Sequence, residues 1–471
     1  MISFEEYQSP FSWRYGSAEM RRIWGEENKR LLWRRLWVSM AEAQTEWGLV
    51  TRDQVDDLKA HLGAVDVALA LEFEKTSHHD LMAELKVFAG QCPLGGGILH
   101  LGATSMDIKD NAEALQIAQS LDLLLPKLND LLNLFAEKID EYAALPVMAF
   151  THLQPAEPTT LGYRLAGYAQ DFLEDHQALI RVRKELKGKG FKGAAGNAAS
   201  FVALLGLDSQ RRFEERLSEG LQLPFFDAAT QTYPRRQDYA VLSALASLAA
   251  SAHKFAFDLR LLQSEVIGEL AEPFGEAQVG SSAMPFKRNP VEAEKICSLA
   301  RAVSTAPLTA WNNFANSLLE RTLDDSANRR TLFPETFLAL DEIVMALSKI
   351  MAGLKVNPVR IKRNLEKFGP FAAVERVLLS AVQNGADRQA MHEVLRKLSM
   401  AAWQALEKSE PNPLAGLVSQ DEQVAKWVVP DDLRQLFAVD GYTGMAEPRA
   451  REIAQKVRGC LDQIADEGQE K

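Results

Sequence analysis

Residues 121–142 read LDLLLPKLNDLLNLFAEKIDEY, and the spacing of the apolar side chains in this stretch decides the fold class. Apolar residues recur every three or four positions, which places them on one face of an α-helix. The members of this seam are Leu121, Leu124, Leu128, Leu131, Phe135, Ile139 and Tyr142. Pro126 lies within the seam and should bend the helix, because proline cannot donate a backbone hydrogen bond.

Two later segments repeat the helical period. The second seam comprises Leu245, Leu248, Ala252, Phe255, Leu259, Leu262 and Val266, and the third comprises Phe337, Leu340, Val344, Leu347, Met351 and Leu354. No comparable run alternates apolar and polar residues as a half-buried strand does. We therefore expect an all-α protein with a central bundle of long helices and an apolar stripe left over for partner chains.

Two breaks in the helical pattern indicate domain boundaries. Gly95, Gly96 and Gly97 end an N-terminal helical region, and Asn357-Pro358 follows the third seam. Glycine and proline interrupt helices, so such clusters favour a boundary. The expected domains are an N-terminal helical domain at 1–108, the long-helix bundle at 109–356 and a C-terminal helical domain at 357–471.

The charge and cysteine content of the chain limit the kinds of partner and ligand that it is expected to bind. The 471 residues include 53 Lys and Arg against 64 Asp and Glu, for a net charge of −11, which argues against binding to nucleic acid or anionic membranes. Binding of an anionic substrate would then require arginines at the binding site itself. Cys92, Cys297 and Cys460 lack metal-ligand spacing, so we expect neither a zinc site nor a disulfide. No signal sequence or membrane-spanning stretch is expected either, and a reducing cytoplasm is the expected location.

The stretch at residues 280–290, GSSAMPFKRNP, is the richest in chemistry. It is expected to form a mobile loop that leads into a helix, with Asn289 as the N-cap and Pro290 in the first helical position. Hydroxyl groups, the cations Lys287 and Arg288, and helix N-terminal amides suit a place where negative charge develops. The alternative is a capped loop between helices without any catalytic role.

Five further polar clusters interrupt the helices. Thr76 to Asp80 contains adjacent histidines that would point about 100° apart on a helix, and Thr104 to Asn111 offers hydroxyls and carboxylates. Both clusters suit helix capping equally well. Phe150 to Thr160 places His152 in an irregular segment bounded by prolines, where a general acid or an ordinary surface histidine would fit.

The fourth cluster is Gln231–Arg236, and the fifth is Arg321–Arg330. Paired arginines with a nearby hydroxyl suit the capture of a phosphate or a carboxylate. A salt-bridged helix end capped by Asp325 or Ser326 is the structural alternative.

Together these motifs resemble the adenylosuccinate lyases, a family of the fumarase/aspartase superfamily, over nearly the whole chain. The matching motifs are Arg14-Tyr15, His79-Asp80, residues 100–111, Thr151-His152, Gln231 to Tyr233, the 280–290 loop and residues 323–330. The last run favours this family over fumarases and argininosuccinate lyases. The resemblance implies a three-domain all-α fold, a homotetramer with active sites built from three subunits, and no metal or organic cofactor.

The implied reaction is β-elimination of fumarate from adenylosuccinate, giving AMP, and from succinylated aminoimidazole carboxamide ribotide, giving the carboxamide. The resemblance makes Ser281 the base and His152 the general acid, with His79 and Lys287 also in the catalytic group. The implied substrate-binding residues are Arg14, Tyr15, Asp80, Thr104, Ser105, Gln231, Asn289, Arg321, Ser326 and Arg330. Of these, Arg14, Tyr15, Arg321, Ser326 and Arg330 correspond to the phosphate site, and Asn289 acts with Lys287 on the succinyl carboxylates.

Three positions depart from the family pattern. Asn197 follows Gly196 where relatives commonly have threonine, Lys295 stands where several relatives have arginine, and Pro234 stands where relatives often have serine. These changes leave open a related lyase that eliminates fumarate or a similar dicarboxylate from another succinylated amine. A non-catalytic structural or binding protein that retains the fold is the alternative from another class.

Overall fold

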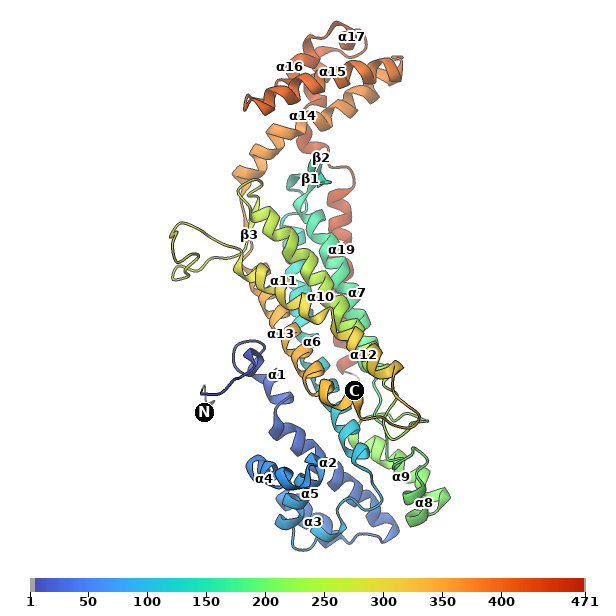
Figure 1. Ribbon diagram of the computed structural model, residues 1–471. Coiled ribbons are helices and arrows are strands. Elements are labelled where there is room, and N and C mark those ends of the chain that lie inside the picture. Colours follow the sequence, from blue (N-terminus) through green and yellow to red (C-terminus); the bar gives the residue numbers. More distant parts are fainter. Residues whose placement is uncertain (1–4, 470–471) are drawn as a thin grey trace. The chain divides into compact units, whose positions relative to one another are not determined.

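The computed structural model describes residues 5–469, and nearly all of its regular structure is α-helical (Figure 1). The all-α prediction is confirmed. The chain divides into two compact units. Unit 1 comprises residues 1–128, 175–250 and 298–345, and unit 2 comprises 129–174, 251–297 and 346–471. The division into three domains at residues 108 and 356 stays a prediction.

Five helices contribute residues to both units. They are α6 (Ser105–Glu141), α7 (Leu161–Glu185), α10 (Arg236–Gln263), α11 (Val291–Val303) and α13 (Asp324–Ala352). The three predicted long helices correspond to α6, α10 and α13, and α6 continues through Pro126. Their seams are almost wholly buried, but Val266 lies beyond the end of α10 and is 85% exposed, so including it in the seam was wrong.

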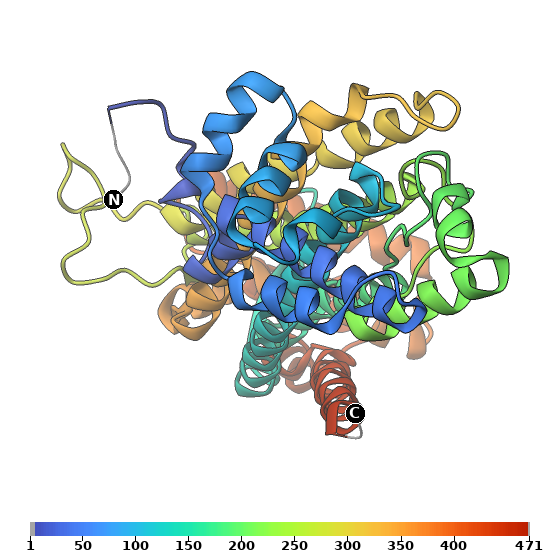
Figure 2. The ribbon, with the colours of Figure 1, turned by 90° about the horizontal axis from the view of Figure 1, so that it is seen from below.

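Unit 1 contains a helical cluster built around aromatic side chains. Its other helices are α1 (Ala18–Ile23), α2 (Glu26–Gln44), α3 (Arg52–His61), α4 (Val67–Ser77), α5 (Asp80–Gln91), α8 (Ala199–Leu205), α9 (Leu207–Leu221) and α12 (Ala306–Ala315), with short 3-10 turns at Pro10–Ser12, Thr45–Trp47 and Gly96–Ile98. Trp33 and Trp37 of α2 share one buried core with Phe201 and Phe213. Helix α2 packs against α9, and Figure 2 shows the blue segment beside the green one.

Unit 2 carries the remaining helices and two small sheets. The helices are α14 (Pro358–Gln383), α15 (Arg388–Glu407), α16 (Leu414–Gln420), α17 (Glu422–Ala425), α18 (Pro430–Leu436) and α19 (Ala446–Gln469), with a 3-10 turn at Val439–Gly441. The strand β3 (Leu270–Ala271) pairs with β4 (Lys355–Val356), and β1 (Pro146–Thr151) pairs antiparallel with β2 (Gln154–Thr160). Phe135, Phe172 and Phe255 pack together in the core of this unit.

The β1–β2 hairpin corrects the irregular segment expected at residues 150–160. His152 and Leu153 form its two-residue turn, with φ of 52° and 60°. Positive φ at both central positions is the conformation that matches the right-handed twist of paired strands. His152 is therefore held at the exposed tip of a hairpin.

Helix α10 is long and apolar enough to cross a membrane by length and composition, so the expectation that no stretch approaches this length was wrong. A buried core helix passes the same test. Leu245, Leu248 and Ala252 of α10 are fully buried within the protein.

Helix α7 contains a buried ionisable side chain, His176, that makes stability depend on pH. Burial lowers the pKa of His176 to about 4. The unfolded chain therefore binds a proton more readily than the folded protein between pH 6.5 and 4, so stability falls as pH falls through this window. At the low-pH end of this window, the pKa shift of His176 corresponds to a loss of about 3 kcal/mol in the free energy of unfolding.

We expect His176→Gln to remove most of this acid-dependent loss, measured as the change in urea-unfolding midpoint between pH 7 and pH 4.5. The exposed His392 on α15 provides the control, because His392→Gln should keep the wild-type pH dependence. An unchanged pH dependence in His176→Gln would show that other groups cause the loss.

Candidate active site

A cavity of about 660 Å³ lies in unit 1 and gathers many of the residues expected to bind substrate. The expected residues that line it are His79, Asp80, Thr104, Ser105, Gln231, Arg321, Ser326 and Arg330. They come from the start of α5, the start of α6, the loop before α10 and the region around the start of α13. Segments that are far apart in the sequence thus meet at one cleft.

Asp80 forms the electrostatic centre of the cleft. Its carboxylate accepts hydrogen bonds from Lys109 Nζ at 2.8 and 3.0 Å and from Arg330 Nη2 at 2.9 Å. Although burial acts to raise it, these two cations lower the pKa of Asp80 to about 2. Asp80 therefore stays ionised and fixes both cations in the cleft. Lys109 was not assigned from the sequence.

His79 is the N-cap of α5, so the expectation that the adjacent histidines lie on one helix was wrong. His78 ends α4 with a φ of 51°, and the chain turns between the two residues. His79 Nδ1 accepts a hydrogen bond from the Met82 amide at 3.3 Å. The neutral ring then carries its proton on Nε2, which lies 3.3 Å from Ser105 Oγ. Capping thus directs Nε2 towards the cleft hydroxyl.

Arg321 presents an unsatisfied donor in the cleft. Its Nε donates to the Thr322 carbonyl at 2.7 Å, whereas Nη1 is buried and has no hydrogen-bond partner among residues 5–469. Burial, with the cations Arg235 and Arg329 nearby, lowers the pKa of Arg321 despite neighbouring carboxylates. Arginine nevertheless remains charged in proteins. A buried guanidinium donor without a partner is costly, and an anion would satisfy it.

Two other arginines that line the cleft, Arg235 and Arg329, are already neutralised. Arg235 binds Asp110 through both terminal nitrogens at 3.1 Å and Asp325 through Nε at 2.7 Å. Arg329 donates to the Tyr233 hydroxyl at 2.8 Å and contacts Glu113 and Asp238. The sequence had marked both arginine pairs as candidate anion ligands. Arg235 of the pair Arg235-Arg236 and Arg329 of the pair Arg329-Arg330 both bind carboxylates of the protein itself.

The network around Arg235 and Arg329 was missed as a functional feature because its partners are distant in the chain. Glu113 is 216 residues from Arg329, and Asp110 is 125 residues from Arg235. The motifs contained the arginines, but no local spacing distinguishes a buried arginine from one that faces substrate. The network supports the floor of the cleft.

Arg14 and Tyr15 do not line this cleft. Arg14 is exposed, and its guanidinium lies 5.8 Å from the centres of the Trp13 and Tyr15 rings. Both residues belong to unit 1.

The loop that carries Ser281 lies in unit 2 and extends clear of that unit's helices (Figures 1 and 2). Ser281 Oγ accepts hydrogen bonds from the amides of Ala283 and Met284 at 3.3 and 3.1 Å. Lys287 is exposed, and its ammonium makes no hydrogen bond or ion pair within the described part of the chain. The Ser281 hydroxyl and the Lys287 ammonium are therefore not bonded to each other in this conformation.

The helix after the loop is capped differently from the sequence expectation. Helix α11 begins at Val291, one residue later than expected, and Asn289 Nδ2 donates to the Gly280 carbonyl at 2.9 Å. The amides of Glu292 and Ala293 donate instead to the carboxylate of Glu272, at 3.1 and 2.9 Å. The anion held by this helix terminus is thus an internal carboxylate.

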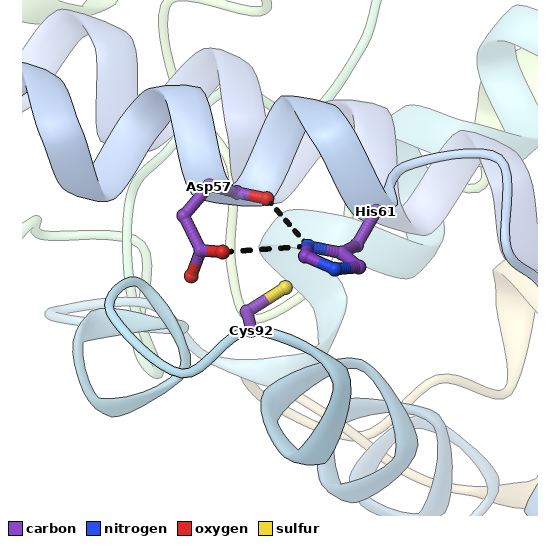
Figure 3. A group of neighbouring side chains, drawn as sticks. All are labelled: Asp57, His61 and Cys92. Carbon is purple, nitrogen blue, oxygen red and sulfur yellow. Dashed lines mark hydrogen bonds and ion pairs between the residues drawn. The ribbon is translucent and has the colours of Figure 1, made fainter.

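One mixed cluster among residues 5–469 has the composition of a metal site, namely Asp57, His61 and Cys92 of unit 1 (Figure 3). The Asp57 carboxylate and His61 Nδ1 already have protein partners. Asp57 Oδ2 accepts from the Leu94 and Gly95 amides at 2.8 Å, and His61 Nδ1 lies 2.9 Å from the Asp57 carbonyl. Burial raises the pKa of the Cys92 thiol to about 11. These interactions indicate that the cluster joins α3 to the turn after α5.

The chain is similar to known lyases over most of its length. A family profile described as "Lyase" matches residues 19–304, and one described as "Adenylosuccinate lyase C-terminus" matches residues 370–453. An adenylosuccinate lyase from Schistosoma mansoni is 42% identical over 85% of this chain and 85% of its own length. The yeast Saccharomyces cerevisiae enzyme is 38% identical over 97% of this chain and 95% of its own. The chain belongs to the adenylosuccinate lyase family.

Solved structures support the same fold for this adenylosuccinate lyase family member. The 3-carboxy-cis,cis-muconate lactonizing enzyme from Pseudomonas putida matches with a TM-score of 0.85 and 25% identity, over 96% of this chain and 100% of its own. A fumarate lyase from Mesorhizobium matches with a TM-score of 0.83 and 22% identity, over 96% of this chain and 99% of its own. The expected fumarase/aspartase superfamily fold is confirmed.

Proposed function

We propose that the protein catalyses β-elimination of fumarate from adenylosuccinate, giving AMP, and from succinylated aminoimidazole carboxamide ribotide. Family membership over nearly the whole chain supports this reaction. The observation that carries the substrate class is the buried donor of Arg321, which lies without a partner in a cleft also lined by Ser326 and Arg330. A phosphate group would satisfy this guanidinium.

The substrate would bind in the unit 1 cleft by its nucleotide end. Arg321, Ser326 and Arg330 would hold the phosphate. Arg14 and Tyr15, which do not line the cleft in this conformation, would reach the phosphate only if the N-terminal segment moved on substrate binding. His79, Thr104, Ser105 and Gln231 would contact the remainder of the nucleotide. Asp80 would keep Arg330 in place through its ionised carboxylate.

The elimination itself would use residues of unit 2. Ser281 would take a proton from the carbon beside a succinyl carboxylate, and the electrons of that C–H bond would form the double bond of fumarate. The C–N bond would break, and His152 would protonate the departing nitrogen. Lys287 and Asn289 would hold the succinyl carboxylates while negative charge builds up on them. The reaction is redox-neutral and balances without a cofactor.

Serine is a weak base, so the alkoxide of Ser281 needs stabilisation. Each unit by which its pKa is lowered requires ~1.4 kcal/mol of preferential interaction with the alkoxide. The amides of Ala283 and Met284 already donate to Ser281 Oγ and would bind the charged form more strongly. Approach of Lys287 on substrate binding would add to this.

We infer a cytoplasmic homotetramer whose active sites combine residues from different subunits. Exposed apolar residues on α12, namely Leu308, Trp311 and Phe314, suit burial against another copy. Sharing would also allow the exposed His152 hairpin and Ser281 loop to act on a cleft of another subunit. Native mass spectrometry of the purified protein tests the tetramer, and a monomer would contradict it.

We expect Arg321→Gln to raise the KM for adenylosuccinate by about 10- to 100-fold, because hydrogen bonds from a charged donor to the phosphate are lost. Steady-state kinetics measure this change. Arg211 provides a matched control, because it is exposed on α9 and does not line the cleft. Arg211→Gln should keep the wild-type KM, and an unchanged KM in Arg321→Gln would move the phosphate site elsewhere.

The second candidate is a related lyase acting on another succinylated amine. Asn197 favours it, because this residue departs from the family threonine and its side chain Oδ1 accepts from the Ala199 amide at 3.1 Å. Adenylosuccinate and its dephosphorylated nucleoside distinguish the candidates. Strong preference for the phosphorylated substrate supports the first candidate, and equal cleavage of both supports the second.

A further inference from the structure

The loop at residues 272–290 is tied together at its base by one amide side chain. The Glu272 backbone N–H donates to Gln263 Oε1 at 3.0 Å, and Gln263 Nε2 donates to the Arg288 carbonyl at 3.1 Å. Glu272 begins the outgoing limb of the loop, and Arg288 lies on the returning limb. Gln263, the last residue of α10, therefore bridges the two limbs.

A second tie anchors the same base to α11. Glu272 is only 3% exposed, and its carboxylate oxygens accept from the amides of Glu292 and Ala293. These amides have no intrahelical acceptor at a helix N-terminus, and an ionised carboxylate is the strongest partner for them. The start of the loop is thus attached to the helix that follows its end.

A third tie lies nearer the tip. Asn289 Nδ2 donates to the Gly280 carbonyl, directly before Ser281. A side chain at position 280 would collide with the Lys287 carbonyl, so glycine is needed where the limbs cross. Ser281 and Lys287 therefore lie at the two ends of a small closed loop whose neck rests on Gln263 and Glu272.

We propose that Gln263 and Glu272 form a clasp that positions Ser281 and Lys287 for proton abstraction. The proposal rests on the proposed function, because it assumes that Ser281 is the base. Gln263 and Glu272 touch no substrate and act through the loop, so both are positioning residues. Loss of the clasp separates the limbs and misplaces the hydroxyl, and small displacements of a reacting group slow catalysis strongly.

The test uses the full-length protein and two readouts. Gln263→Met keeps a side chain of similar length but removes both hydrogen bonds across the loop. We expect kcat to fall about 10- to 100-fold while KM changes less than about threefold, since the nucleotide end binds in unit 1. Without substrate, amide hydrogen exchange at Glu292, Ala293 and the loop should become at least about tenfold faster.

Glu272→Gln provides a second variant, because one amide oxygen cannot replace two carboxylate oxygens, and it should change the same readouts. Ser264→Ala is the matched control, since Ser264 Oγ bonds only the Leu261 carbonyl. If amide hydrogen exchange is unchanged in both Gln263→Met and Glu272→Gln, the clasp does not exist. If exchange becomes faster while kcat stays at the wild-type value, the clasp exists but does not position Ser281 and Lys287 for catalysis. If the wild type releases no fumarate, the proposed function fails, whereas the exchange result still decides whether the clasp exists.

Discussion

Ser281→Ala is expected to lower kcat for fumarate release by about 1000-fold or more, because alanine removes the only proposed base for the elimination. The side chain is partly buried, and within residues 5–469 its hydroxyl bonds to amides of its own loop. The fold should therefore survive, with an unchanged melting temperature. Binding of adenylosuccinate should also survive, measured by calorimetry, because the nucleotide end binds in the unit 1 cleft.

Ser282 provides the matched control for this variant. It is the next residue of the same loop and is exposed. Ser282→Ala should lower kcat by less than about tenfold, because the Ser282 hydroxyl accepts no proton in the proposed reaction. Near-normal turnover in Ser281→Ala would show that another group is the base.

His152→Asn is expected to lower kcat by about 100- to 10,000-fold, the usual contribution of a general acid. Asparagine is chosen because it tolerates the positive φ that the turn imposes at this position. The hairpin should therefore keep its shape, and the loss should reflect the missing proton donor. Steady-state kinetics with adenylosuccinate measure the effect.

The variant Leu153→Asn distinguishes loss of the general acid His152 from a change in the geometry of the hairpin turn. Leu153 is the other central residue of the turn and is 70% exposed. This variant should retain most of the wild-type turnover. If it lost as much as His152→Asn, hairpin geometry rather than proton donation would explain both results.

The long helices were predictable because their signal is local. The seams of α6, α10 and α13 repeat within each helix, so the period alone identifies them. The β1–β2 hairpin was not predictable in the same way. Pro155 and Pro158 argue against a strand, and the His152-Leu153 turn lacks the glycine or asparagine that usually identifies such turns.

The cleft was predictable as a set of residue types but not as a set of contacts. The resemblance selected His79, Arg321 and Arg330, whereas the local sequence could not show that Arg329 is neutralised by Glu113, 216 residues away. The cap of α11 illustrates the same limit. Local rules favoured Asn289, but a carboxylate 20 residues upstream of Glu292 takes the helix amides.

The most direct test of the proposed reaction is product formation from adenylosuccinate by the purified wild-type protein. AMP and fumarate should be released promptly and in equal amounts, without any added metal or cofactor. A folded protein that releases neither product from adenylosuccinate would contradict the account.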